Sequence, residues 1–247
     1  MTKQKARRFL VIPAAVLLLL LTALLSGGRS AGLSGWAMRH GVSPAAYPPE
    51  LAALYERNED ARQFVRDYPA MRDSDPVIDL SEECAAGTAP TLFQWDERWG
   101  YRSYNENFMA LTGCAPTCMS MAAIALTGDT SLDPWAMAQY AEENGWNVPG
   151  SGTSWSFFAE GAEGLGLDSV PIPADRERVL ENLAVGNMIV CVVGPGDFTT
   201  EGHFILLCGE EDGQVRVHDP NSRKNTDRLW DFDAIADQMP ALGVLRR

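Results

Sequence analysis

The hydrophobic pattern of the chain begins with an uninterrupted apolar stretch, residues 9–25, preceded by basic residues between positions 3 and 8. A basic segment followed by a hydrophobic one is typical of a secretory signal or a signal anchor, and the basic side stays in the cytoplasm. The stretch is just long enough to cross a membrane, and no clean Ala-x-Ala cleavage site follows it.

Residues 1–30 are therefore predicted to be a cytoplasmic basic stub and a single-pass signal anchor in the cell membrane. The rest of the chain would then lie outside the membrane. Cleavage of this segment would instead give a secreted protein.

Residues 31–88 are predicted to be a stalk with short helices. Apolar spacing indicates helices over 50–55 and 59–68, the second with Asn58 as its cap and Pro69 as its stop. Two roles remain open: a spacer from the membrane, or an inhibitory or stabilising arm lying across the following domain. The sequence favours the spacer.

Residues 89–247 are predicted to form one domain, with helices before strands. Helical spacing or composition indicates helices over 119–126, 134–144, 156–165, 175–184 and 231–238. The period changes at 188–193, a continuous β-rich run, and strands are also expected at 203–208, 214–218 and 242–245. Early helices and a later antiparallel sheet predict the α+β class, with the helix after residue 113 packed on the sheet.

The net charge of the chain is −13, although its first thirty residues contain no acidic group. The exported part is thus strongly acidic. This balance argues against nucleic acid as a partner and against adhesion to an anionic lipid surface.

Cys114 is a candidate nucleophile. It lies in Gly113-Cys114-Ala115-Pro116-Thr117, at the start of an apolar helix, and Pro116 suits the first turn of a helix. The positive end of the helix dipole favours the thiolate, the form that attacks carbonyl carbons. The simpler alternative is a small buried cysteine beside a turn.

Three further residues have side chains that suit such a nucleophile. Gln94 precedes Cys114 in an aromatic-rich stretch, and its amide can donate to a developing oxyanion. His203 begins one predicted strand and Asp219 follows the next, so a hairpin brings them side by side. Asp219 can then orient the His203 ring toward a thiolate. Taken singly, each residue also has a purely structural explanation.

Together, four motifs resemble the papain-like cysteine peptidases of family 39, whose best-known members remove double-glycine leader peptides from bacteriocins. The similarity is closer to the standalone, secreted branch. The motifs are Gln-x-Asp-x-x-Trp-Gly at 94–100, Gly-Cys-Ala-Pro-Thr at 113–117 where the family has Gly-Cys-Gly-Pro-Thr, Gly-His-Phe at 202–204 and Asp-Pro at 219–220. They cover about residues 90–245 in chain order.

The resemblance implies a papain-like fold with Cys114 as nucleophile, His203 as base, Asp219 as the group that orients it and Gln94 as oxyanion donor. Ala115 departs from the family's usual glycine. Its methyl group would narrow the cleft or shift the backbone slightly, and we expect the family's fold and site to tolerate this change. The transporter members carry membrane-spanning and nucleotide-binding domains on the same chain. This sequence contains no Gly-x-x-x-x-Gly-Lys-Ser/Thr motif, so leader processing coupled to export is not implied.

The other cysteines suggest neither a metal nor a cofactor. Cys114 and Cys118 have i, i+4 spacing, but none of the three histidines lies near them in sequence, which makes zinc improbable. Cys191 and Cys208 lie in predicted strands. The sequence favours buried thiols there, with a Cys191–Cys208 disulfide as the alternative in an exported protein.

The predicted function is an extracytoplasmic cysteine peptidase acting on a peptide or protein substrate. One alternative is a cell-wall peptide amidase or transferase that uses the same site. The other is a binding module that keeps the fold without turnover.

Overall fold

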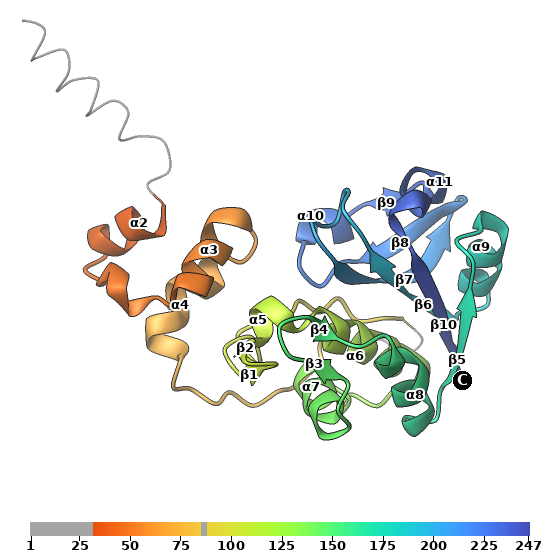
Figure 1. Cartoon of the computed structure of the whole chain (residues 1–247), viewed down its shortest axis with the longest axis horizontal. Helices are drawn as coiled ribbons and strands as arrows, with labels where there is room; N and C mark the ends of the chain where they lie inside the picture. Colours follow the sequence, from red (N-terminus) through yellow and green to blue (C-terminus); the bar gives the residue numbers. More distant parts are fainter. Residues whose placement is uncertain (1–31, 85–87) are drawn as a thin grey trace, which may run out of the picture.

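The computed structural model describes residues 32–84 and 88–247 (Figure 1). The predicted signal anchor in residues 1–30 lies outside this part of the chain, so it stays a prediction. Within residues 32–84 and 88–247, no helix is both long and apolar enough to cross a membrane.

Residues 32–71 form a small helical unit, which we call the N-terminal bundle. It consists of α2 (Leu33–Arg39), the 3-10 turn η1 (Pro44–Ala46), α3 (Pro49–Arg57) and α4 (Arg62–Met71). In α3 the buried residues Leu51, Leu54 and Tyr55 recur at helical spacing and form one apolar face. The helices predicted over 50–55 and 59–68 are thus present, and α2 was not predicted.

Two predicted boundaries in the N-terminal bundle are wrong. Asn58 does not cap α4 but follows the end of α3, where its side-chain oxygen accepts from the backbone N–H of Asp60. Pro69 lies inside the last turn of α4, which ends at Met71. A proline removes one backbone hydrogen bond of a helix. Because Pro69 is so close to the end of α4, the helix continues for two more residues despite this loss.

The N-terminal bundle packs against the following domain. The Phe64 ring stacks on Tyr101 with their centroids 4.1 Å apart, and the Tyr101 hydroxyl donates to the Phe64 carbonyl at 2.7 Å. Gly100 permits this approach, because a Cβ there would lie 2.7 Å from the Phe64 ring. These contacts favour the arm over the spacer among the two roles considered for this segment.

A helical lobe follows, shown below the sheet in Figure 1. Its elements are β1 (Ser103–Tyr104), β2 (Asn107–Phe108), α5 (Met109–Thr112), α6 (Cys114–Thr127), α7 (Pro134–Glu143), β3 (Asn147–Val148), β4 (Gly152–Thr153) and α8 (Ser156–Gly164). The central helix α6 is buried from Ala115 to Ile124. It ends at Gly128, whose φ of 77° is in the left-handed region that glycine tolerates best.

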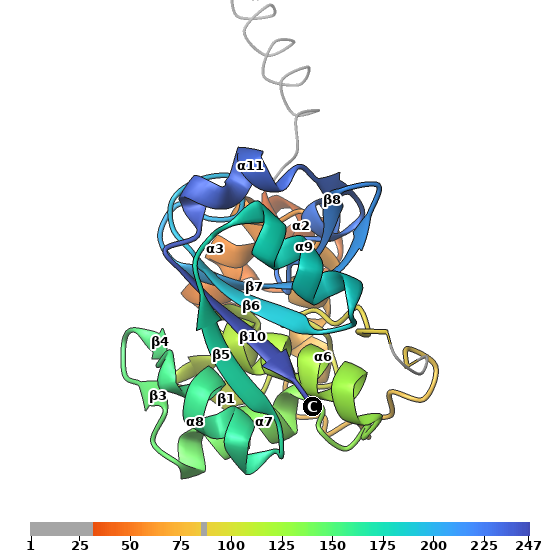
Figure 2. The same ribbon diagram turned by 90° about the vertical axis from the view of Figure 1, so that its right-hand side faces the viewer.

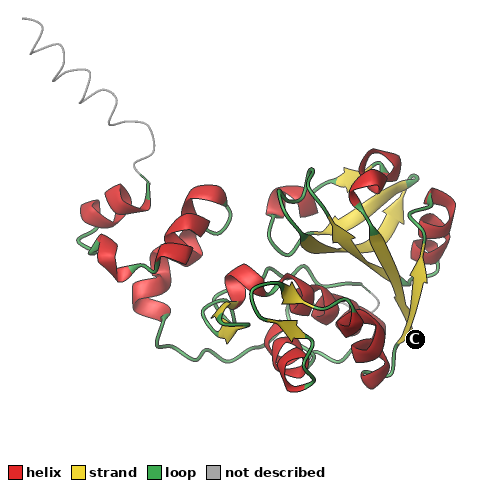
Figure 3. Cartoon of the chain, in the orientation of Figure 1, coloured by secondary structure: helices red, strands yellow, loops and turns green. Residues whose placement is uncertain are grey.

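The second lobe is a six-stranded sheet with strand order β5–β10–β6–β7–β8–β9, in which every neighbouring pair is antiparallel. Figure 3 shows these strands together above the helical lobe, which itself contains the short strands β1 to β4. The strands are β5 (Asp168–Ile172), β6 (Met188–Val193), β7 (His203–Glu211), β8 (Gln214–His218), β9 (Leu229–Trp230) and β10 (Ala241–Arg246). The helical segments of this lobe are α9 (Arg176–Ala184), α10 (Arg223–Thr226), α11 (Phe232–Ile235) and the 3-10 turn η2 (Ala236–Gln238).

Both faces of the sheet are covered, which explains the continuous apolar run of β6. Met188 and Val190 belong to the core shared with α6 and α8, whereas Ile189, Cys191 and Val193 belong to the core shared with α9 and α11. Alternate residues of one strand thus serve opposite faces. Figure 2 shows α9 and α6 on the two sides of the sheet. The predicted α+β class, with the helix after Gly113 packed on an antiparallel sheet, is confirmed.

The β7–β8 hairpin sets the position of the predicted histidine and aspartate. Its turn contains Asp212 and Gly213 with φ of 52° and 76°, the left-handed pair that suits a tight hairpin. Leu206 of β7 lies opposite His218 of β8. The start of β7 and the residues just after β8 therefore lie at the same edge of the sheet, next to α6.

Candidate active site

Cys114 is the first residue of α6. Gly113 precedes it at the end of α5, where a Cβ would lie 2.5 Å from the Met109 carbonyl oxygen, so a side chain does not fit there. Pro116 occupies the first turn, where a backbone N–H has no partner inside the helix. The partly exposed residue Cys114 thus sits at the positive end of the α6 dipole.

Ala115, the departure from the usual glycine, does not narrow the cleft in the way the sequence suggested. It is fully buried, and it lines neither of the two cavities that Cys114 lines. Its backbone N–H donates to the Cys114 sulfur and so favours the thiolate.

His203 and Asp219 meet at the edge of the sheet. The Nε2 atom of His203 donates to the Asp219 Oδ1 at 2.8 Å, and Asp219 is 1% exposed. Because Nε2 is used by the carboxylate, Nδ1 is the ring nitrogen left for Cys114. The structure thus brings Cys114, His203 and Asp219 together, although Cys114 and Asp219 are 105 positions apart in the sequence.

The Asp219 carboxylate is held by further donors that sequence analysis did not single out. Oδ1 also accepts from the backbone N–H of Asn221 at 2.9 Å, and Oδ2 accepts from the Asn225 side chain at 2.8 Å. Asn225 is brought there by α10, which Ser222 caps by accepting from the Asn225 backbone N–H. These donors fix the orientation of the buried Asp219 carboxylate toward the His203 ring.

Cys114 and His203 favour each other's charged form. Burial alone raises the pKa of Cys114 and lowers that of His203. At His203 the hydrogen bond to Asp219 and the interaction with Cys114 outweigh burial. At Cys114 the hydrogen bond and charge of His203 outweigh it together with the backbone N–H groups of Phe204 and Ala115. The pKa of Cys114 is therefore lowered, and the pKa of His203 is raised to about 10. Between these two values the site contains a thiolate and an imidazolium.

Gln94 is held by both lobes. Its backbone N–H donates to the Pro220 carbonyl and its side-chain nitrogen donates to the Ala110 carbonyl, both at 2.8 Å. The side chain is 3% exposed and lines one cavity together with Cys114. One amide hydrogen is used by Ala110, so the second remains for a group bound beside Cys114.

Two cavities meet at the candidate nucleophile. The first has a volume of about 560 Å³, and Gln94 is among its lining residues. The second has a volume of about 760 Å³ and is lined by Asn105 and by residues 150–153. Both are lined by Leu111, Cys114, Glu201, Gly202 and His203. Cys114 and His203 thus lie in the middle of an extended cleft, with room for a chain on both sides.

Some cleft residues carry no recognisable signal in the sequence. Arg57 and Asn58 line the first cavity although they belong to the segment predicted as a stalk. Asn105 lies in the β1–β2 turn with φ of 53°, and its side chain donates to the Val148 and Gly152 carbonyls. An Asn-rich turn signal at 105–107 was available for this hairpin, but nothing in it indicates proximity to Cys114.

The remaining cysteines are free thiols. Cys191 lies opposite Ile205 in the β6–β7 pairing, so Cys208 is three residues further along β7. An odd offset places the two side chains on opposite faces of the sheet, which prevents the alternative disulfide. Burial raises the pKa of Cys191 and of Cys118, so both are held as neutral thiols. Among the described residues, no group of three His, Cys, Asp or Glu side chains is arranged to hold a metal ion.

Comparison with known proteins gave one family match, described as "Peptidase_C39 like family", over residues 88–239. Similar solved structures include the peptidase domain of Streptococcus ComA, a bi-functional ABC transporter involved in a quorum sensing pathway. That comparison has 18% identity and a TM-score of 0.44 and covers 55% of this chain and 92% of the other. A C39-like peptidase from Bacillus anthracis has 17% identity and a TM-score of 0.35, with coverage of 55% and 90%. No curated protein matches the chain.

Proposed function

Because the chain belongs to the C39-like peptidase family, we propose that it is a cysteine peptidase in which Cys114, His203 and Asp219 form a catalytic triad and Gln94 donates to the oxyanion. The family gives the chain a cysteine-peptidase fold. The catalytic roles and the reaction are our proposal, because inactive members are also found on such folds.

One observation carries the proposal. His203 interacts with the Cys114 sulfur and with the buried Asp219 carboxylate at the same time, where the two cavities of the cleft meet. A partly exposed cysteine with a lowered pKa is expected at a nucleophilic site, whereas the buried thiols Cys118 and Cys191 show the opposite shift.

Acylation follows from this geometry. The Cys114 thiolate attacks the carbonyl carbon of a peptide bond, and the carbonyl electron pair moves to oxygen. The free amide N–H of Gln94 and the Cys114 backbone N–H at the start of α6 stabilise that oxyanion. As the C–N bond breaks, the His203 imidazolium gives its proton to the leaving amine.

Deacylation uses the same groups in the reverse roles. Neutral His203 takes a proton from a water molecule, whose oxygen attacks the thioester carbonyl. The C–S bond then breaks, which releases the carboxylic acid and restores the Cys114 thiolate beside the His203 imidazolium. Asp219 holds the ring so that Nδ1 faces the sulfur in both steps.

We also propose that residues 89–247 are the peptidase domain and that residues 1–30 anchor it at the outer side of the cell membrane. Support for the anchor comes from the basic and apolar pattern of residues 1–30 alone. Membrane fractionation with protease accessibility of the full chain tests this placement, and a peptidase domain protected inside intact cells would contradict it.

The decisive experiment for the proposed activity is cleavage profiling. The full chain is incubated with a peptide library under reducing conditions, and the products are identified by mass spectrometry. New peptide termini that disappear after alkylation of Cys114 are the expected result. Cleavage of cell-wall peptides alone would favour the amidase alternative, and absence of Cys114 labelling by a thiol-directed probe would favour a binding module.

Gln94→Ala is expected to lower kcat by about 10²- to 10³-fold, the usual effect of removing one oxyanion donor. KM should change much less, because the oxyanion exists only in the transition state. Steady-state kinetics on a peptide from the profiling experiment measures both. Gln63→Ala is the matched control, since that exposed glutamine donates its side-chain hydrogen bonds to Asp67. Equal losses in the two variants would contradict the role of Gln94.

Asp219→Asn is expected to lower kcat by up to about 10⁴-fold, because an amide stabilises the wrong orientation or protonation of the His203 ring. Asp219 raises the pKa of His203, so its removal should also move the alkaline limb of the pH profile to lower pH. The pH dependence of kcat/KM measures this shift. Asp129→Asn changes an exposed aspartate that bonds Ser131, and it should leave the limb in place. An unmoved limb in Asp219→Asn would exclude the orienting role.

A further inference from the structure

The N-terminal bundle shares a hydrophobic core with the segment that carries Gln94. Phe93 and Trp95, on either side of Gln94, are buried in one cluster with Leu51, Leu54 and other residues of the bundle. Ala110, whose carbonyl accepts from the Gln94 side chain, belongs to the same cluster. The bundle therefore lies directly behind the cleft, as part of the same packed unit.

The loop between α3 and α4 also reaches the sheet lobe. The Asn58 side chain donates to the backbone carbonyl of Asn221 at 2.8 Å and to its side-chain oxygen at 3.0 Å. Asp60 accepts from the backbone N–H of Arg223 at 2.8 Å. These bonds hold the end of α3 against the start of α10, where the first cavity ends.

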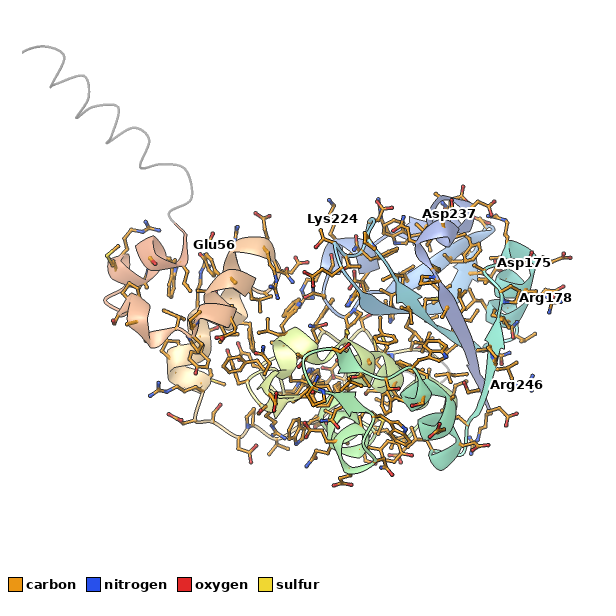
Figure 4. The ribbon with its side chains drawn as sticks, viewed as in Figure 1. Glu56, Asp175, Arg178, Lys224, Asp237 and Arg246 are labelled. Carbon is orange, nitrogen blue, oxygen red and sulfur yellow. The ribbon has the colours of Figure 1, made fainter. Side chains whose placement is uncertain are left out.

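A cationic residue flanks this contact on each side. Arg57 precedes Asn58, Lys224 follows Arg223, and both side chains line the first cavity together with Cys114. In the part of the chain that the structure describes, neither forms an ion pair. Figure 4 shows Lys224 on the side of the sheet lobe that faces the N-terminal bundle.

The acidic groups of the first cavity lie on the β6–β7 loop. Glu201 lines both cavities, which places it near Cys114 in the middle of the cleft rather than at the bundle end. Asp197 already accepts from the Gln238 side chain at its Oδ2. Arg57 and Lys224 bring two positive charges to the bundle end of the cleft, where the Asp60 carboxylate is bonded to the Arg223 backbone N–H, in a protein whose overall charge is −13.

We propose that Arg57, held at the cleft by the Asn58–Asn221 contact, and Lys224 form a subsite for a carboxylate of the peptide substrate. This inference rests on the proposed peptidase function and adds a substrate class to it. A guanidinium binds a carboxylate through two parallel hydrogen bonds, and an ammonium adds a second positive charge. The carboxylate belongs either to an Asp or Glu side chain or to the C-terminus of the substrate.

A paired peptide library tests this subsite. Each peptide is made with Glu and with Gln at a given position, and with a C-terminal acid and a C-terminal amide. The wild-type full chain is expected to cleave the carboxylate form about tenfold faster at one position on one side of the scissile bond. A Glu preference identifies the side chain as the source, and an acid preference identifies the C-terminus.

Arg57→Glu should reduce this preference to about one or invert it, and Arg57→Lys should keep part of it. Arg178→Glu is the matched control, because it makes the same charge change on α9, at the far side of the sheet (Figure 4). It should keep the full preference. A preference that is absent from the wild type, or unchanged in Arg57→Glu, overturns the subsite.

A binding measurement separates failure of the subsite from failure of the proposed function. Should no peptide be cleaved, the same fluorescent peptide pairs are titrated against the full-length Cys114→Ala protein and its Arg57→Glu derivative. Tighter binding of the carboxylate form that Arg57→Glu removes would support the subsite without any turnover. Equal binding of both forms would overturn it.

Discussion

The Cys114→Ala protein is expected to lose peptide hydrolysis by about 10⁶-fold in kcat, because removal of a covalent nucleophile has an effect of this order in other triads. No other described thiol can replace it. Cys118 and Cys191 are buried and held as neutral thiols, and Cys84 and Cys208, although partly exposed, line neither cavity of the cleft.

The fold of this variant should be retained. Cys114 is partly exposed at the first position of α6, and alanine is the best helix former. A thermal unfolding midpoint close to that of the wild type is the control for folding. Cys208→Ala is the matched control for cysteine loss, and it should keep full turnover.

The measurement is a progress curve on one peptide from the profiling experiment, at enzyme concentrations high enough to detect slow cleavage. Binding of the uncleaved peptide to the Cys114→Ala protein shows that the cleft is intact. Cleavage at an undiminished rate would contradict a thiol mechanism and, with it, the proposed function.

Much of the fold could be predicted because strong local patterns agree with the tertiary structure. The helix beginning at Cys114 is predicted by three features: Gly113, Pro116 and a long apolar run that ends at Gly128. The run at 188–193 is apolar without alternation, and it forms a central strand that is buried on both faces. Tertiary packing and local preference point to the same structure in these elements.

The elements that were not predicted depend on contacts that a local pattern does not contain. β5 is mostly exposed and includes Pro171, so its sequence lacks the apolar pattern of a strand. It becomes a strand by pairing with β10. The helix predicted over 231–238 divides into α11 and η2, because the chain turns there toward β10. Short or edge elements of this kind are fixed by their neighbours.

The same distinction holds for the candidate site. The sequence motifs single out four residues, and the structure brings Cys114, His203 and Asp219 into contact while Gln94 lines the cleft. Arg57 and Asn225 could not be found in this way. Arg57 reaches the cleft only because the N-terminal bundle packs behind Gln94, and Asn225 reaches Asp219 only through the one-turn helix α10.

The second large effect concerns the ionisation of Cys114 and His203. In the wild type, alkylation of Cys114 by iodoacetamide is expected to stay fast well below the ordinary thiol pKa of about 8.5. Burial raises the pKa of Cys114, but the hydrogen bond and charge of His203, together with the backbone N–H groups of Phe204 and Ala115, lower it by more. The pH dependence of the alkylation rate, followed by mass spectrometry of the peptide containing Cys114, measures this value.

The profile of kcat/KM against pH should be bell-shaped. Its acid limb marks protonation of the Cys114 thiolate and should lie below the ordinary thiol range. Its alkaline limb marks loss of the His203 proton. Burial lowers the pKa of His203, but Asp219 and Cys114 raise it to about 10, so turnover should persist through neutral pH and fall only as the pH passes that value.

His203→Ala removes the main group that lowers the pKa of Cys114, whereas burial, which raises this pKa, remains. The pKa of Cys114 should therefore rise to or above the ordinary value. At pH 6 an ordinary thiol is only about 0.3% thiolate, and the alkylation rate should therefore fall by about a hundredfold. His40→Ala is the matched control, since that exposed ring stacks on Trp36, far along the sequence from Cys114, and should not change the rate. If His203→Ala alkylates as the wild type does, Cys114 and His203 do not form an ion pair. The mechanism would then lack its proton donor, whatever the peptide profile shows.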